Sequence, residues 1–301
     1  MVFDKTKEEI GLYTAETIDF FERYLHSLIL SKDDSYKKAG KIDFWVENWT
    51  NYLKREVHFK PSLPALRRGS IIYADFGFNV GREYGGLHYA IVLNKIDSRD
   101  NHLLHVLPLS SAKPHDDLSK LPYFKLDLGN EIYRLATNKG HQRITEVDKK
   151  ILELEVKEKE NNKMSKGIDE SLAQNRQLLD DLTKLAETTG NENNNQNIIE
   201  QTIENITQTN KKLYSDLEIY RVRSEEIRNL KKDLTPILSD TRKMLEKISK
   251  MKKGSLAILN QVTTISKMRI YDPQNKDSLL FDIVLSETTM DRIDEALKKI
   301  Y

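Results

Sequence analysis

Hydrophobic residues along the chain follow two different periods, and each period predicts a different kind of element. Residues 71–76 and 88–93 are rich in β-branched and aromatic side chains, a composition that favours β-strands. Further short runs at 103–109 and 123–128 are bounded by clusters of Asn, Asp, Pro and Ser. Several short strands with short connections predict a small antiparallel barrel.

Residues 1–60 have a helical pattern, which residues 31–34 divide into at least two helices. The second helix carries an aromatic-rich stripe at helical spacing. The stripe consists of Ile42, Phe44, Trp45, Trp49, Tyr52 and Leu53. We expect this face to dock on the barrel, and a groove for a partner is the alternative. Residues 61–66 follow as a linker marked by two prolines.

A heptad pattern dominates residues 144–253. From residue 199, alternating steps of four and three select mostly apolar positions, namely Ile199, Ile203, Ile206, Asn210, Leu213, Leu217, Tyr220, Ser224, Ile227, Lys231, Leu234, Leu238, Thr241, Leu245 and Ile248. A weaker seam comprises Ile168, Leu172, Asn175, Leu179, Leu182 and Ala186. A period of 3.5 residues keeps one stripe of a helix facing a partner helix, so both segments are predicted to form coiled-coil helices.

A polar stretch at 188–197 separates the two seams and predicts a turn between them. The simplest structure is an antiparallel helical hairpin with arms of roughly 45–55 residues, on the order of 65–80 Å long. Pairing of one seam with a second protomer is the alternative. Asn210, Ser224 and Lys231 occupy core positions, which indicates a specific register or partner in place of maximal stability.

Strand-like sequence resumes at residue 254, so the hairpin is predicted to be an insertion within one folding unit. Residues 287–300 have an apolar face at helical spacing, and Ser286 is a plausible N-cap for this closing helix. The predicted fold is therefore α+β. It has a helical segment at 1–60, a barrel from 66–143 and 254–301, and a coiled-coil insertion at 144–253.

Composition limits the classes of function. The chain has 48 Lys and Arg against 47 Asp and Glu, a net charge of +1, so any nucleic-acid site must be a local patch. It contains no Cys, which excludes disulfides and thiolate metal sites. We find neither a signal peptide nor an apolar run long enough to cross a bilayer, and expect a cytoplasmic protein without membrane contact.

The chain is organised around residues 67–93, which read as a strand, a loop with four glycines and a second strand. His88 lies where the flexible loop enters the second strand, a common position for a reactive side chain. His titrates near neutral pH, so His88 is the best candidate for a general acid or base. With no paired metal-ligand spacing and no phosphate loop, we expect neither a metal nor a cofactor.

The order of the segments resembles that of the PemK/MazF-like toxins, the ribonuclease half of many bacterial toxin–antitoxin pairs. Residues 67–86 are similar to the family's "RRG, strand, D-F, G-x-E-x-G-G" start, and residues 106–111 to its strand ending in a Thr or Ser. Residues 256–270 are similar to its "Q-hydrophobic-x-T-hydrophobic-x-K-x-R" segment. The resemblance covers about residues 66–140 and 254–301, and it implies an SH3-like barrel of the MazF/CcdB type.

The resemblance also implies an activity: metal-independent cleavage of single-stranded RNA through attack of the 2′-hydroxyl. It assigns catalytic roles to His88, Ser110 and Glu83 and RNA contacts to four residues. Those four are Arg82, Gln261, Lys267 and Arg269. The family usually has an Arg where this chain has His88. Either another residue takes over the role of that Arg, or His88 acts by proton transfer.

The resemblance implies two partners besides RNA, a cognate antitoxin and a second copy of the chain. Each assigned residue also has a purely structural interpretation. His88 and Ser110 could be ordinary residues of strand ends, Lys267 and Arg269 a solvated strand face, and Gln261 a partner of the loop backbone. Two other functions remain open at this point: a toxin of the gyrase-poison type that acts by binding alone, and an interaction protein in which the coiled coil is the working part.

Overall fold

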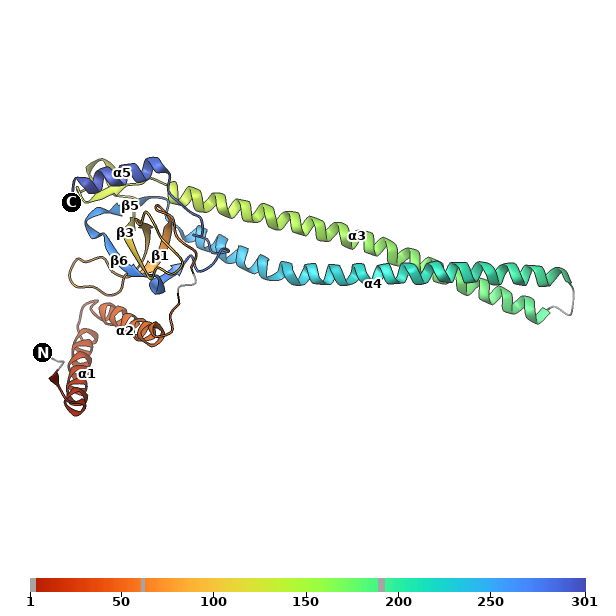
Figure 1. The fold of residues 1–301 in the computed structure, drawn as a ribbon, viewed down its shortest axis with the longest axis horizontal. Coiled ribbons are helices and arrows are strands. Elements are labelled where there is room, and N and C mark those ends of the chain that lie inside the picture. Colours follow the sequence, from red (N-terminus) through yellow and green to blue (C-terminus); the bar gives the residue numbers. More distant parts are fainter. Residues whose placement is uncertain (1–3, 61–62, 189–192) are drawn as a thin grey trace. The chain divides into compact units, whose positions relative to one another are not determined.

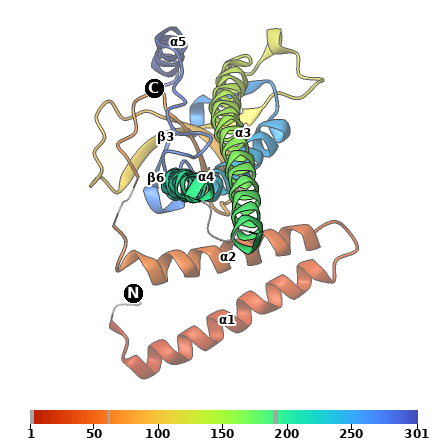
Figure 2. The ribbon, with the colours of Figure 1, turned by 90° about the vertical axis from the view of Figure 1, so that its right-hand side faces the viewer.

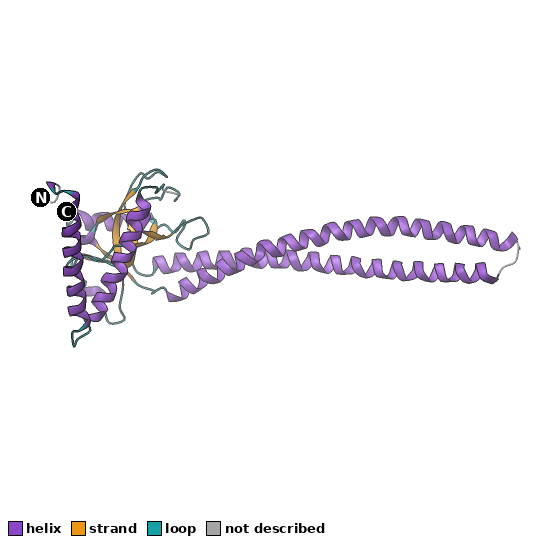
Figure 3. Ribbon diagram, turned by 90° about the horizontal axis from the view of Figure 1, so that it is seen from below, coloured by secondary structure: helices purple, strands orange, loops and turns teal. Residues whose placement is uncertain are grey.

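The computed structural model describes residues 4–60, 63–188 and 193–301 (Figure 1). It combines long helices with an antiparallel sheet. The chain divides into two compact units, which we call the sheet unit (residues up to 136 together with 250–301) and the arm (137–249). The strands gather in the sheet unit, whereas the arm is helical throughout its described residues (Figure 3).

Two helices precede the sheet, α1 (Lys7–Ile29) and α2 (Tyr36–Glu56), as the sequence predicts. Thr6 caps α1 by accepting a hydrogen bond from the Glu9 amide, while the Glu9 side chain accepts one from the Thr6 amide. The two helices form a hairpin (Figure 2). The predicted linker at 61–66 lies partly outside the described residues.

Only part of the aromatic stripe of α2 packs against the sheet and its loops. Ile42 is buried, and Trp45 packs against Gly77 and the Arg269 guanidinium. In contrast, Trp49 is 49% exposed, and Phe44 and Leu53 are exposed as well. The prediction that this face docks on the sheet is therefore confirmed for part of the stripe.

The described strands form one antiparallel sheet in the order β4-β5-β3-β2-β1-β7, with β6 paired to β3. Their bounds are β1 Ile71–Asp75, β2 Leu87–Val92, β3 Leu103–Ser111, β4 Lys125–Asp127, β5 Ser255–Ile258, β6 Thr263–Ser266 and β7 Ile270–Asp272. The long strand β3 pairs with β2, β5 and β6. Strands from both sides of the arm insertion thus belong to one sheet.

Alternate residues of the central strands bury one face of the sheet. The apolar cluster on that face contains Leu63, Leu66, Ile72, Ala74, Phe76, Ala90, Val92, Leu104, Val106, Ile265 and Ile270. The closing helix α5 (Glu287–Lys298) buries Ile293 completely. Its N-cap is Ser286, which accepts a hydrogen bond from the Thr289 amide, as predicted.

The arm consists of α3 (Glu131–Thr188) and α4 (Asn193–Lys250), each 58 residues long. At 1.5 Å per residue, each helix is about 87 Å long, more than the sequence predicts. The difference arises mainly at the start of α3, which we placed at residue 144. Ile132 and Ala136 are buried in the sheet unit, so tertiary packing extends the helix beyond its heptads. The turn predicted at 188–197 is wrong at its edges, because Thr188 ends α3 and residues 193–197 already belong to α4; residues 189–192 lie outside the described part of the chain.

The two helices pair in an antiparallel register. Asn161 donates a hydrogen bond to Ser224 over 3.0 Å, and Asn175 donates one to Asn210 over 2.9 Å. In an antiparallel pair, the numbers of facing residues have a constant sum. The sum is 385 for both of these pairs, so they belong to the same register. Lys231 forms an ion pair with Glu158 of the facing helix. The polar core residues of the seam therefore find their partners within this chain.

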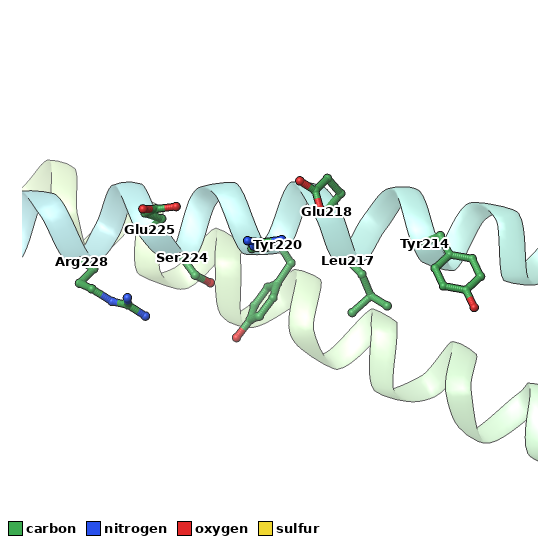
Figure 4. Close-up of a pocket in the computed structure, with 8 residues that line it drawn as sticks. Tyr214, Leu217, Glu218, Tyr220, Ser224, Glu225 and Arg228 are labelled. Atoms are coloured by element: carbon green, nitrogen blue, oxygen red, sulfur yellow. The ribbon is translucent and has the colours of Figure 1, made fainter.

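The predicted seam of α4 uses two heptad positions, and only one of them lies in the interface with α3 along the whole seam. Every seventh residue from Ile206 to Ile248 is buried or half-buried, and Tyr220 and Ser224 extend toward α3 (Figure 4). At the other position the prediction is wrong for four residues. Ile203, Leu217 and Leu238 are 51%, 39% and 42% exposed, and the side chain of Lys231 is 57% exposed. A two-helix interface is narrow, and residues on both flanks of the central position share its edges.

We expect the arm to be dispensable for folding of the sheet unit. The register continues to the base of the arm, where Gly140 faces Ile248, so a cut across both helices leaves two adjacent ends. Replacing residues 145–240 with a short Gly/Ser linker joins positions that the register pairs, and loop closure costs little. Both tryptophans, Trp45 and Trp49, lie in α2 and report on the sheet unit. Their fluorescence melting curve should match that of the full chain, and an insoluble product would contradict this expectation.

Among the described residues, no helix is both long and apolar enough to span a membrane.

Candidate active site

His88 and Ser110 lie on neighbouring strands at one pocket of the sheet unit. Strands β2 and β3 pair Ala90 with Pro108, and the same register continued by two residues brings His88 opposite Ser110. Both residues line a pocket of about 400 Å³, a volume sufficient for a small ligand or part of a larger one. The structure thus brings together two of the three residues predicted to be catalytic.

The Ser110 hydroxyl is buried and makes no hydrogen bond with the described residues. Leaving a buried polar group without a partner costs roughly 1–3 kcal/mol, so such groups in native structures require an explanation. Ser110 lines the pocket next to His88, where a ligand oxygen could supply the missing partner. The unpaired hydroxyl is the feature of this pocket that most directly indicates a binding site.

Tyr84 holds the imidazole of His88. Its hydroxyl donates a hydrogen bond to the Leu109 carbonyl and lies 3.1 Å from His88 Nδ1, with the two rings 4.4 Å apart. A tyrosine hydroxyl has one proton, so the oxygen is left to accept from Nδ1. This arrangement favours the tautomer in which Nδ1 carries the proton and Nε2 keeps its lone pair.

Burial shifts the pKa values of the titratable groups at the pocket. Burial lowers the pKa of His88 below its usual 6.5, and a hydrogen bond with the Gly85 backbone acts in the opposite direction. His88 is therefore neutral at physiological pH, as a general base must be. Burial also raises the pKa of Tyr84 to about 12, so its hydroxyl stays protonated.

The glycine-rich loop before His88 is closed at its base by backbone contacts. The Gly86 amide donates to the Gly77 carbonyl over 2.6 Å, and the Phe76 amide donates to the Gly86 carbonyl over 2.8 Å. A side chain on Gly85 would bring its Cβ to 2.6 Å from the Gly77 carbonyl oxygen. Gly85 therefore has to be glycine for the loop to close and set the start of β2.

Three predicted site residues belong to this loop and its support, and none of them lines the pocket. Glu83 accepts a hydrogen bond from the Val80 amide over 3.3 Å. It therefore orients a loop amide, whereas the contact with His88 is made by Tyr84. Gln261 accepts from the Tyr84 amide and donates to the Arg82 carbonyl, which corresponds to its structural interpretation. The Arg82 side chain is exposed on the loop.

The predicted RNA contact of Lys267 is wrong. Its ammonium group forms an ion pair with Asp97 at 2.8 Å, and the side chains of both residues are 0% exposed. The ammonium group also donates to the Ser98 carbonyl. A charge enclosed in this way is unable to reach a phosphate in solvent, so Lys267 is a structural residue.

Arg269 is partly buried away from the His88 pocket. Its guanidinium lies over the Trp45 ring at 5.2 Å, and its Nε atom is buried without a hydrogen-bond partner. It lines a second pocket of about 410 Å³ between α2 and the sheet. The predicted RNA contact of Arg269 therefore falls outside the site of His88 and Ser110.

Sequence reasoning missed several residues of the pocket. Tyr84 contacts His88 without lining the pocket, and the lining itself includes Tyr73, Tyr89, Lys113 and Lys252. Lys252 lies at the C-terminal end of the insertion predicted at 144–253, more than a hundred residues from His88, Ser110 and Lys113, and no motif marks it. Only the folding of β5 beside β3 brings this segment to the pocket.

Among the residues that the structure describes, no group of three or more His, Asp or Glu side chains is arranged to hold a metal ion. Comparison of the chain with protein-family models gave no match, and comparison with curated proteins gave none either. The function therefore has to be argued from the geometry of the pocket.

Proposed function

We propose that the protein is an endoribonuclease toxin of the PemK/MazF type that cleaves single-stranded RNA without a metal ion. The observation that carries the proposal is the buried, unpaired Ser110 hydroxyl opposite a neutral His88. The proposal includes an SH3-like barrel for the sheet unit, which the antiparallel pairing of β3 with β2, β5 and β6 supports. A cognate antitoxin and a homodimer belong to the same proposal.

In the proposed reaction, His88 Nε2 removes the proton from a ribose 2′-hydroxyl. The 2′-oxygen attacks the adjacent phosphorus, the bond from phosphorus to the 5′-oxygen breaks, and the 5′-oxygen takes up a proton from solvent. The products are a 2′,3′-cyclic phosphate and a 5′-hydroxyl end. A positioned base of this kind typically contributes about 10²–10⁴ in rate.

Three other side chains of the pocket have roles in this reaction. The Ser110 hydroxyl donates a hydrogen bond to a phosphate oxygen, and the bond strengthens as negative charge develops in the transition state. Lys113 and Lys252 are the cations of the pocket lining and offset that charge. They take over the role that the family assigns to an Arg, so His88 is free for proton transfer.

We expect Ser110→Ala to lower the cleavage rate more than it lowers RNA affinity. A hydroxyl that binds the phosphate mainly in the transition state changes the chemical step, typically by about 10²–10³ for a donor to a developing oxyanion. The test is cleavage of a long single-stranded RNA with and without EDTA, by wild type and variant, beside a binding assay. Equal losses of rate and affinity would make Ser110 a binding residue only.

The alternative is a toxin that acts by binding alone, and the same experiment distinguishes it. The observation that favours it is the absence of an arginine side chain from the His88 pocket lining that the structure describes. Cleavage that survives EDTA supports the endoribonuclease. Tight binding of RNA or protein by a folded wild-type protein that cleaves no RNA would support the alternative.

A further inference from the structure

Three tyrosines form a continuous aromatic surface beside the His88 pocket. Tyr73 and Tyr89 are paired across β1 and β2, with their ring centres 5.0 Å apart, and both line the pocket. Tyr271 of β7 is the extra residue of a β-bulge beside Tyr73, since β7 pairs Asp272 with Tyr73 and Ile270 with Ala74. Tyr271 is 42% exposed, as expected for a bulge that redirects a side chain.

The aromatic surface continues onto α2. Tyr271 interacts with the hydroxyl of Tyr52, which donates a hydrogen bond to Asp75 over 3.4 Å, and the ring centre of Tyr52 lies 6.4 Å from that of Trp45. Trp45 and Tyr52 line the second pocket together with Trp49, which leaves about half of its surface exposed. We call this series of side chains the aromatic track. Its members are Tyr89, Tyr73, Tyr271, Tyr52, Trp45 and Trp49.

Positive charge lies at both ends of the aromatic track. At one end Lys113 and Lys252 line the His88 pocket. At the other end the guanidinium of Arg269 lies over Trp45 at 5.2 Å, and that of Arg55 lies over Tyr52 at 5.5 Å. A guanidinium stacked on a ring keeps its charge available to an anion beside the ring.

The carboxylates closest to the aromatic track are mostly withdrawn from its surface. Asp75 is 2% exposed and accepts a hydrogen bond from the Gly77 amide. Asp272 is 5% exposed and accepts one from the Leu280 amide. Glu56 lines the second pocket and is exposed. An anionic ligand on the track would therefore meet more positive than negative charge.

We propose that the aromatic track binds the part of a single-stranded nucleic acid that extends beyond the His88 pocket. Bases stack on the rings, and the phosphates are held by the cations at the two ends, because aromatic rings flanked by cations suit a chain of flat bases on an anionic backbone. The inference rests on the proposed function, since it takes the strand cut at His88 to be the strand that the track holds. The track then determines how long a substrate the protein prefers.

The test measures binding separately from cleavage. The full chain is titrated with a 2′-O-methyl trinucleotide and a 2′-O-methyl dodecanucleotide, neither of which has a 2′-hydroxyl to attack. Wild type should bind the longer strand more tightly. Trp49→Ala and Tyr271→Ala should each lose most of this gain, roughly 5–150-fold in affinity, since stacking is worth about 1–3 kcal/mol per base.

Tyr123→Ala is the matched control. Tyr123 is 79% exposed in the sheet unit, contacts Phe124 and lines neither of the two pockets. This variant should bind both strands as wild type does. Trp49 and Tyr271 belong to different elements, so two folded variants with the same defect argue against a local structural cause.

The outcomes separate this inference from the proposed function. If wild type cleaves RNA but binds the dodecanucleotide no more tightly than the trinucleotide, the track proposal is overturned and the active site stands. In that case the second pocket, between α2 and the sheet, is better explained as a docking surface for a protein. If wild type shows the length dependence and the two variants lose it, the track stands even when no RNA is cleaved. Wild-type affinity in both variants would also overturn it.

Discussion

The His88→Ala variant should lose RNA cleavage by about 10²–10⁴ while the sheet unit stays folded. His88 lies opposite the unpaired Ser110 hydroxyl, and its Nδ1 atom is held by Tyr84, which leaves Nε2 to act as the base. His88 is only half-buried and belongs to no ion pair that the structure describes, so its truncation leaves no buried charge behind. Single-turnover cleavage of a labelled RNA measures the loss.

The pH dependence of cleavage gives this prediction a second readout. The base must be neutral to act, and the pKa of His88 is lowered by burial, so it stays neutral to a lower pH than an exposed histidine. The acid limb of kcat/KM should therefore have an apparent pKa below 6.5. His115→Ala, at an exposed position outside the pocket lining, is the matched control and should keep wild-type activity. Wild-type cleavage by a folded His88→Ala protein would contradict the assignment.

The second large effect is on stability. Lys267→Met should lower the free energy of unfolding of the sheet unit by about 3–5 kcal/mol, because it leaves the Asp97 carboxylate buried without its counter-ion. Asp97 also accepts hydrogen bonds from the Leu66 amide and the Asn101 side chain. Loss of the ion pair therefore also weakens the contact between the segment before β1 and the sheet. Urea unfolding followed by tryptophan fluorescence measures the change.

Two further variants test whether the effect is electrostatic. The double variant Asp97→Asn with Lys267→Met removes the buried charge altogether and should recover part of the loss. Lys276→Met changes an exposed lysine near β7 in the same way and should stay within about 0.5 kcal/mol of wild type. If Lys267→Met were as stable as Lys276→Met, the buried ion pair would be unimportant for folding.

Elements with a strong local pattern were predictable from the sequence. The heptads of α3 and α4, the apolar runs of the central strands and the cap of α5 at Ser286 all depend on residues a few positions apart. Such patterns report which face of an element is buried, because a helix or strand repeats over a fixed number of residues. The start of α3 was misplaced because Ile132 and Ala136 are buried by contacts remote in sequence.

From the sequence, only the residues of the candidate site that lie at ends of strands could be predicted. Glycines before His88 and a hydroxyl at the end of β3 were visible in the sequence, and the antiparallel register then brought His88 opposite Ser110. Tyr84 lies four residues before His88 in the loop. Nothing in the sequence indicated that its hydroxyl would contact both His88 and the Leu109 carbonyl. Its role depends on the position of β3, which the sequence of the loop does not encode.

The sequence by itself determined that the chain has strands, two long paired helices and a histidine at a loop–strand junction, because each follows from local periodicity and residue type. Only the tertiary structure decided which charges are available. Lys267 and Arg269 are two residues apart, and they looked alike in the sequence. The fold encloses Lys267 with Asp97 and sets Arg269 over Trp45. The desolvation of a charge depends on every element packed around it, so no pattern along the chain could distinguish these two residues.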